Sequence, residues 1–200
     1  MASHILISAL ILLCFFGTCY GKGLFSSLQR TLVANASTKQ GEVLKSGLDK
    51  ITVTWTLNQS FPASTADAYK QVKVKLCFAP ISQKDRAWRK TKDDLTKDKT
   101  CQFTIADTPY DASTVQEWLV ERDVPTATYF VRVYALDSSG HEMAYGQTTD
   151  AKKTTNLFEI QGISGRHVSL DIAAGCFSAF SVVSLFGFFY VEKKKAKRAQ

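Results

Sequence analysis

Few side chains in this sequence have the types and spacing that enzymatic chemistry requires. The three histidines are His4, His141 and His167, and a Ser-His-Asp arrangement would depend on His141 alone, because the other two lie in or beside apolar terminal segments. The neighbouring carboxylates Asp93 and Asp94 stand among lysines, where the raised pKa that acid catalysis uses is not expected. No His/Cys cluster has the spacing of a metal site, and the sequence has no glycine-rich phosphate loop. We therefore expect no enzyme, no metal and no cofactor.

The amino-terminal end has the pattern of a secretory signal. The apolar run ILISALILLCFF at residues 5–16 is followed by the small-residue stretch GTCYG, although the leading MASH contains no Lys or Arg. This pattern predicts a signal peptide over residues 1–21, cleaved after Gly21. An amino-terminal membrane anchor is the alternative, but the run is short for a membrane span.

A second apolar segment lies near the carboxyl end. Residues 172–191 contain no charged side chain, and a helix of about 20 residues crosses the core of a bilayer. The basic residues in 192–200 favour the cytosolic side. We therefore expect a single-pass type I protein that passes through the endoplasmic reticulum, with its ectodomain outside and a cytosolic tail too short to fold. Small residues that let helices approach closely form a candidate packing face at Gly175, Ser178 and Ala179.

This topology sorts the five cysteines. Cys14 and Cys19 lie in the predicted signal peptide and Cys176 in the membrane segment, so only Cys77 and Cys101 face an oxidising compartment. Two such cysteines are expected to form a disulfide. Closing a loop of this length stabilises the fold by about 3 to 3.5 kcal/mol in the chain-entropy model.

Charge is concentrated in two places. Of the formal net charge of +7, the tail at 192–200 carries +4 and the segment between Cys77 and Cys101 carries +3, so the rest of the ectodomain is neutral. The topology keeps this basic chain away from nucleic acid, and we expect none as a partner. The loop has mixed charges and places Trp88 between Arg86 and Arg89, as in an anchor residue of a protein interface. The alternative is a tryptophan that packs on its own sheet among solvated charges.

Alternating sequences predict an all-β ectodomain. KITVTWTL at 50–57 and QVKVKLCF at 71–78 place apolar side chains on one face, and ATYFVRVYALD at 127–137 is rich in β-branched and aromatic residues. A third strand is expected at 101–105, a hairpin partner at 141–148 and a last strand around Phe158 and Ile160. Residues 109–124 are left open between a strand and a helical turn. Cys77 falls on the outward face of its strand, so the disulfide is expected at the surface or edge of a sheet.

Short alternating strands with polar turns predict an immunoglobulin- or fibronectin III-like β-sandwich. We expect an extended segment at 22–47, the sandwich at 48–160 and a juxtamembrane stalk at 161–171. The triplets that begin at Asn35 and Asn58 are candidate glycosylation sites.

The segment APISQKDRAWRKTKDDLTKDKTCQF, together with the leader, the YFVRVYALD strand and the carboxyl-terminal helix followed by lysines, closely resembles the plant high-affinity nitrate transporter-activating protein family. The resemblance covers nearly the whole mature chain. It implies a non-transporting partner, in a hetero-oligomer at the plasma membrane, of a multispanning transporter that it stabilises and activates. On the family motif, Arg89 and Asp98 are the residues whose loss is expected to matter most.

These observations favour a loop that docks on the transporter. The hypothesis assigns the contact to charged and aromatic loop residues, Arg86, Trp88, Arg89, Asp94 and Asp98, while the helix packs beside the transporter. Variants of Arg89 or Asp98 are expected to lose the partner and keep the ectodomain fold. The alternatives are a cell-surface ligand-binding receptor or adhesion module, which the short tail disfavours, and capture of nitrate by the loop cations.

Overall fold

The structure, a computed structural model, describes residues 23–198 apart from Ala112. The predicted signal peptide at 1–21 lies outside the described residues. The chain divides after Gly162 into two units, a β-sandwich and a carboxyl-terminal helical unit.

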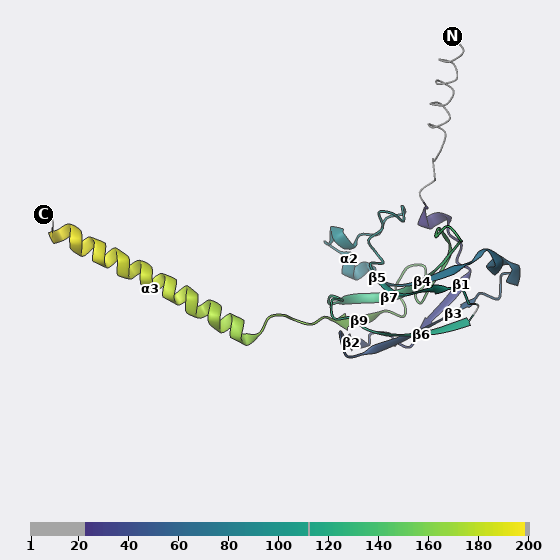
Figure 1. Cartoon of the computed structure of the whole chain (residues 1–200), viewed down its shortest axis with the longest axis horizontal. Coiled ribbons are helices and arrows are strands. Elements are labelled where there is room, and N and C mark those ends of the chain that lie inside the picture. The colour runs from purple at the N-terminus through teal and green to yellow at the C-terminus, as the bar shows by residue number, and fades with distance from the viewer. Residues whose placement is uncertain (1–22, 112, 199–200) are drawn as a thin grey trace, which may run out of the picture. The chain divides into compact units, whose positions relative to one another are not determined.

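The sandwich consists of two sheets (Figure 1). The three-stranded sheet is antiparallel, in the order β1 (Leu32–Ala36), β3 (Lys50–Leu57) and β6 (Ser113–Leu119). The six-stranded sheet has the order β2 (Val43–Lys45), β9 (Phe158–Gln161), β7 (Ala127–Leu136), β4 (Gln71–Phe78) and β5 (Phe103–Pro109), and β8 (Glu142–Gln147) also pairs with β7. The predicted all-β, immunoglobulin-like class is confirmed.

The main core lies between the two sheets and follows the predicted alternation. The inward side chains of β3, among them Trp55, and of β4, among them Val74, are almost fully buried. The odd-numbered residues of β7, Tyr129 to Ala135, complete the same core. Burial of these apolar side chains drives the association of the sheets.

Several strand boundaries differ from the sequence expectations. The segment at 22–47 contains β1 and β2, so strands of both sheets begin before the expected sandwich boundary at residue 48. The segment 109–124, for which a strand and a helical turn were both expected alternatives, contains the strand β6. The strand expected from Cys101 begins two residues later, at Phe103, as β5. The hairpin partner and the last strand are present as β8 and β9.

Strand β7 is buried on both faces. Its even-numbered residues Phe130, Arg132 and Tyr134 point away from the main core, yet all three are buried. Short helices occur in the segments outside the sheets: η1 (Phe25–Ser27), η2 (Ala63–Ala68), α2 (Pro80–Gln83) and η3 (Ala87–Arg89). In Figure 1 the segment with α2 and the amino-terminal η1 lie on the side of the six-stranded sheet that faces away from β1, β3 and β6.

The second unit contains one helix, α3 (Val168–Arg198). Within the described residues it is the one helix long and apolar enough to cross a membrane. It encloses the predicted span at 172–191, begins within the expected stalk and continues into the expected tail. The small residues Gly175, Ser178 and Ala179 all lie on this exposed helix.

Candidate partner-binding site: the disulfide loop

The predicted disulfide is present. It joins Cys77 at the end of β4 to Cys101 and closes a loop with a sequence separation of 24, named here the disulfide loop. Cys77 faces away from the main core, as its position in the strand predicts, but it is fully buried, and it packs with Ala79 and Phe130 in a second apolar cluster. The expectation of a bridge at the surface or edge of a sheet therefore fails for Cys77, because β4 lies between β7 and β5 and other segments cover its outer face, whereas Cys101 is partly exposed.

Part of that cover is an aromatic cluster around a buried cation. Arg132 is 1% exposed, and the carbon at the centre of its guanidinium lies 4.2 Å from the ring centroid of Phe25. The guanidinium also donates hydrogen bonds of 3.1 Å and 3.3 Å to the Gln147 Oε1 and one of 3.1 Å to the Tyr134 hydroxyl. Cation–π contacts and hydrogen bonds of this kind compensate the desolvation of a buried charge.

The amino-terminal segment Gly23–Leu28, which carries Phe25, also holds the disulfide loop. The Phe25 amide donates to the Asp93 carbonyl at 2.7 Å, and the Leu95 amide donates to the Gly23 carbonyl at 3.0 Å. The Ser26 amide and hydroxyl donate to the Asp93 carboxylate at 2.7 Å and 2.8 Å. The loop is therefore paired with the start of the described chain as well as closed by the disulfide.

Asp98 organises the loop from within. Its Oδ1 accepts hydrogen bonds from the Lys92 amide at 3.0 Å, the Thr100 amide at 3.2 Å and the Thr100 hydroxyl at 2.7 Å. These bonds join two parts of the loop across six residues of sequence. The carboxylate thus positions the backbone of the loop.

Asp94 makes a tighter local turn. Its carboxylate accepts from the Thr96 hydroxyl at 2.6 Å and from the Thr96 amide at 3.1 Å, and it pairs with the Lys97 ammonium at 3.1 Å. The hydrogen bonds from Thr96 and Lys97 lower the pKa of Asp94 to about 2.

Arg89 is buried, which its charge did not suggest. It is 8% exposed, and its guanidinium lies over the ring of Phe78 at 4.3 Å, at the end of the main core. Its Nη1 donates a long hydrogen bond of 3.4 Å to the Ser82 carbonyl, and its Nε has no hydrogen-bond partner in the described structure. Desolvation lowers the pKa of Arg89.

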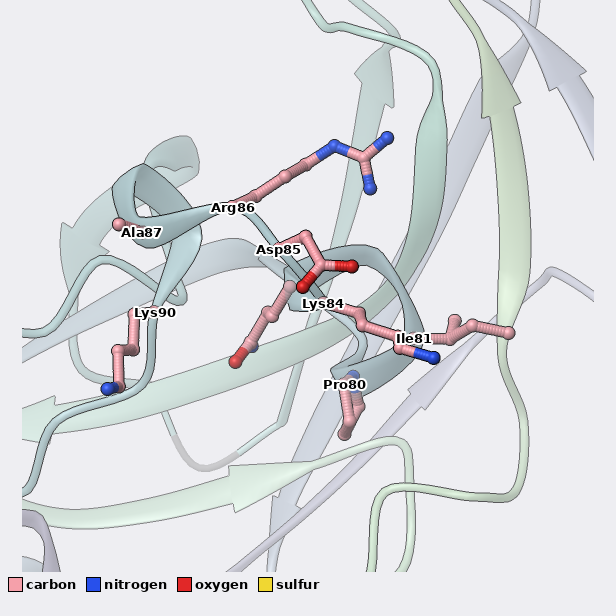
Figure 2. Close-up of a pocket in the computed structure, with 8 residues that line it drawn as sticks. Pro80, Ile81, Lys84, Asp85, Arg86, Ala87 and Lys90 are labelled. Atoms are coloured by element: carbon pink, nitrogen blue, oxygen red, sulfur yellow. The ribbon is translucent and has the colours of Figure 1, made fainter.

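The exposed large apolar side chains of the loop lie at α2 and η3. Ile81 is 70% exposed and Trp88 59% exposed, and Arg86 lies between them in sequence and is also exposed. The turn that joins α2 to η3 passes through Asp85, whose φ of 58° lies in the left-handed region. Ile81, Asp85 and Arg86 line a hollow of about 670 Å³ (Figure 2), whereas Trp88 lies outside it. We refer to Pro80–Lys90 as the α2–η3 surface.

The predicted site residues thus fall into two groups. Arg86 and Trp88 are available at the surface, whereas Arg89 is buried and Asp94 and Asp98 are engaged within the loop. The sequence did not lead us to expect the contact between Phe25 and Arg132. The one signal of a second buried layer was an arginine in a strand otherwise rich in apolar residues. No group of three or more potential metal ligands occurs among the residues that the structure describes.

The two candidate glycosylation sites have different surroundings. Asn35 is exposed on β1, opposite Thr54 of β3. Asn58 is partly buried in the turn after β3, where its Oδ1 accepts a hydrogen bond of 3.0 Å from the Ser60 amide.

The fold and the loop define a class of protein: an immunoglobulin-like β-sandwich with an apolar carboxyl-terminal helix and a disulfide-closed, charged loop. Residues 25–165 match the NAR2 family model, described as high-affinity nitrate transporter accessory, Ig-like domain. The chain belongs to this family of high-affinity nitrate transporter accessory proteins.

Named relatives agree with this membership. The chain is 58% identical over 162 residues to High-affinity nitrate transporter 3.1 of Arabidopsis thaliana, covering 80% of this chain and 76% of the relative. It is 52% identical over 172 residues to High-affinity nitrate transporter-activating protein 2.1 of Oryza sativa subsp. japonica, covering 85% of this chain and 81% of the relative. It is also 46% identical over 205 residues to Probable high-affinity nitrate transporter-activating protein 2.2 of Oryza sativa subsp. japonica. That match covers 98% of this chain and 96% of the relative. This naming supports an accessory role.

Proposed function

We propose that this chain is a non-catalytic accessory subunit that binds, stabilises and activates a multispanning high-affinity nitrate transporter in a two-component uptake system. The observation that carries the proposal is that a chain of the accessory family presents an exposed tryptophan and arginine, Trp88 and Arg86, on a loop fastened at several points. Fastening matters because a surface ordered before binding loses less conformational entropy when it docks.

The membrane topology supports the same division of roles. Secondary transporters build a pathway from several discontinuous helices, and α3 alone offers no such arrangement. The partner therefore carries nitrate, and this chain supports it. In our proposal the signal peptide at 1–21 is removed in the endoplasmic reticulum, the ectodomain is extracellular, and α3 anchors the protein in the plasma membrane.

The proposed roles of the site residues follow their surroundings. Arg86 and Trp88 contact the transporter, whereas Arg89, Asp94 and Asp98 hold the loop in its binding conformation. The small residues of α3 at Gly175, Ser178 and Ala179 pack beside a transporter helix.

Co-expression tests this proposal. A high-affinity nitrate transporter is expressed alone or with the full-length chain, and nitrate uptake and co-purification are measured. We expect uptake and transporter abundance to rise with the wild-type chain. Trp88→Ala should lower the affinity for the transporter by about thirtyfold, since tryptophan anchors at interfaces often contribute about 2 kcal/mol or more.

Val115→Ala is the matched control, because Val115 is 66% exposed on β6 of the other sheet. It is expected to behave as wild type. A transporter that is equally abundant and active without the chain would contradict the accessory role.

A further inference from the structure

We propose that the hollow between Arg86 and Arg89 receives a carboxylate side chain from an extracellular segment of the transporter. This inference rests on the proposed function and assigns the chemistry of the contact. It begins from a second hollow, of about 240 Å³, that adjoins the one in Figure 2. The two hollows share Ile81 and Arg86, so Arg86 stands between them.

The charges that line the hollows are mostly positive. Lys84, Arg86 and Lys90 face the larger hollow against Asp85 alone, and Arg86 and Arg89 face the smaller one against Glu159. A surface with this excess of cations is complementary to an acidic partner.

The two arginines are prepared differently for such a partner. Arg89 is held in one place by its contact with Phe78. Within the described part of the chain the hydrogen bonds of Arg86 are made by its backbone, and Figure 2 shows its guanidinium extending away from Lys90. An unoccupied planar guanidinium can bind both oxygens of a carboxylate at once.

The rim of the smaller hollow adds hydrogen-bonding groups. The Ser82 Oγ accepts from the Thr128 amide at 2.7 Å, and the Thr126 Oγ1 accepts from the Gly162 amide at 2.9 Å. Because each hydroxyl is held as an acceptor, its own proton remains to be donated. Both residues line the hollow with Arg89.

The apolar surroundings favour a protein segment over a free anion. Ile81 and Trp88, which flank Arg86 in sequence, are 70% and 59% exposed. Ile81 lines both hollows, so a polypeptide that places a carboxylate at Arg86 would also cover this side chain, and the exclusion of water would strengthen the ion pair. A small free anion would leave it uncovered.

Charge reversal in the full-length chain tests the assignment. Arg86→Glu is co-expressed with the transporter, and the amount of transporter that co-purifies is measured at low and at raised salt. We expect a loss of about tenfold or more, because like charges would then face each other across the contact. Arg86→Lys should retain part of the binding, since lysine keeps the charge but lacks the bidentate fork.

Lys70→Glu makes the same change of charge at the other end of β4, where Lys70 is exposed. It should co-purify with the transporter to within about twofold of wild type, as expected for a charge outside the contact. In a second arm, acidic residues of the extracellular segments of the transporter are replaced one at a time by arginine, and one of them should restore binding to Arg86→Glu.

Two results would overturn the inference. If the wild-type chain and Arg86→Glu co-purify equally, the hollow is not the contact, although the accessory role stands. If nitrate alone binds the wild-type chain and Arg86→Glu abolishes that binding without affecting the transporter, the hollow belongs to a free anion. Failure of the wild-type chain to bind the transporter would instead reject the accessory role itself.

Discussion

Arg86 and Arg89 stand three residues apart in one charged loop and have opposite surroundings. Arg86 is exposed beside the two hollows, whereas Arg89 is 8% exposed and lies on the ring of Phe78. Substitution of an exposed side chain such as Arg86 can alter binding to a partner without disturbing the fold. A buried side chain contributes first to the fold.

This contrast gives a paired prediction on stability. Arg89→Ala should lower the free energy of unfolding by about 1 to 3 kcal/mol, because it removes the cation–π contact and the packing of a long side chain. Arg86→Ala should change it by less than about 0.5 kcal/mol, as exposed positions usually do. Urea denaturation of both variants measures the difference, and equal effects would contradict the burial of Arg89.

Asp94 gives a prediction on pH. Its pKa is lowered from 3.8 to about 2 in the folded protein, so the folded state favours the ionised carboxylate. The stabilisation is therefore present above the ordinary pKa near 4 and is lost as the pH falls through about 2.

Asp94→Asn should make the stability of the protein depend less on pH in the acid range. Thermal unfolding midpoints between pH 5 and pH 2 should fall less steeply for the variant than for wild type, since asparagine does not titrate. Lys70→Gln, which changes an exposed cation just before β4, at the end of that strand opposite Cys77, serves as the control. If the unfolding midpoint of Asp94→Asn falls with pH as steeply as that of wild type, Asp94 does not contribute to the loss of stability in acid.

At the scale of the elements, the amino-terminal segment and the disulfide loop depend on each other. Phe25 covers Arg132, and the backbone on either side of Phe25 pairs with the loop at Asp93 and Leu95. Although these segments are separated by about seventy residues, they form one layer over the outer face of β7.

Phe25→Ala should therefore destabilise the fold by about 1 to 2 kcal/mol, through loss of the cation–π contact and exposure of a buried charge. Limited trypsin digestion should also cleave sooner at the lysines of the loop. Leu24→Ala removes a side chain that is 45% exposed and should change stability by less than about 0.5 kcal/mol. Similar digestion rates for the two variants would contradict the coupling.

The elements that sequence could predict are those with a regular period. Strands β3, β4 and β7 follow from alternation that places Trp55, Val74 and Val133 in one core. The burial of Phe130 and Arg132 could not be predicted in this way, because their cover comes from parts of the chain that are distant in sequence. Phe25, about a hundred residues earlier, covers Arg132. Cys77 and Ala79 pack against Phe130.

The candidate site was predictable to a similar extent. The expected compartment and the cysteine count were sufficient to predict the disulfide, which is present. Trp88 is exposed, and its role as an interface anchor stays a prediction. Nothing in the local sequence distinguishes Arg86 from Arg89, since burial of an arginine depends on where the aromatic ring of Phe78 lies in space.

At the scale of the whole molecule, the chain combines a folded sandwich with an apolar helix of 31 residues. If the α2–η3 surface supplies the contact, the helix serves chiefly to concentrate the ectodomain at the membrane. Tethering of this kind raises the effective concentration of a binding module without adding new contacts.

Replacement of residues 172–191 by an unrelated membrane helix tests this division. We expect the transporter to co-purify with the hybrid chain at an affinity within about tenfold of wild type, because the ectodomain contact and the tether both remain. Adding Trp88→Ala to the hybrid should abolish the remaining binding. Complete loss in the hybrid alone would assign the main contact to Gly175, Ser178 and Ala179.

The pairing of Gly23 and Phe25 with the loop also bears on how the protein can be labelled. A purification tag or fluorescent protein fused directly ahead of Gly23 would emerge beside Leu95, which lies 3.3 Å from the position that a Cβ on Gly23 would take. Such a fusion would crowd the loop that is proposed to dock. A tag at the carboxyl end, beyond α3, is separated from that loop by the whole helix in sequence.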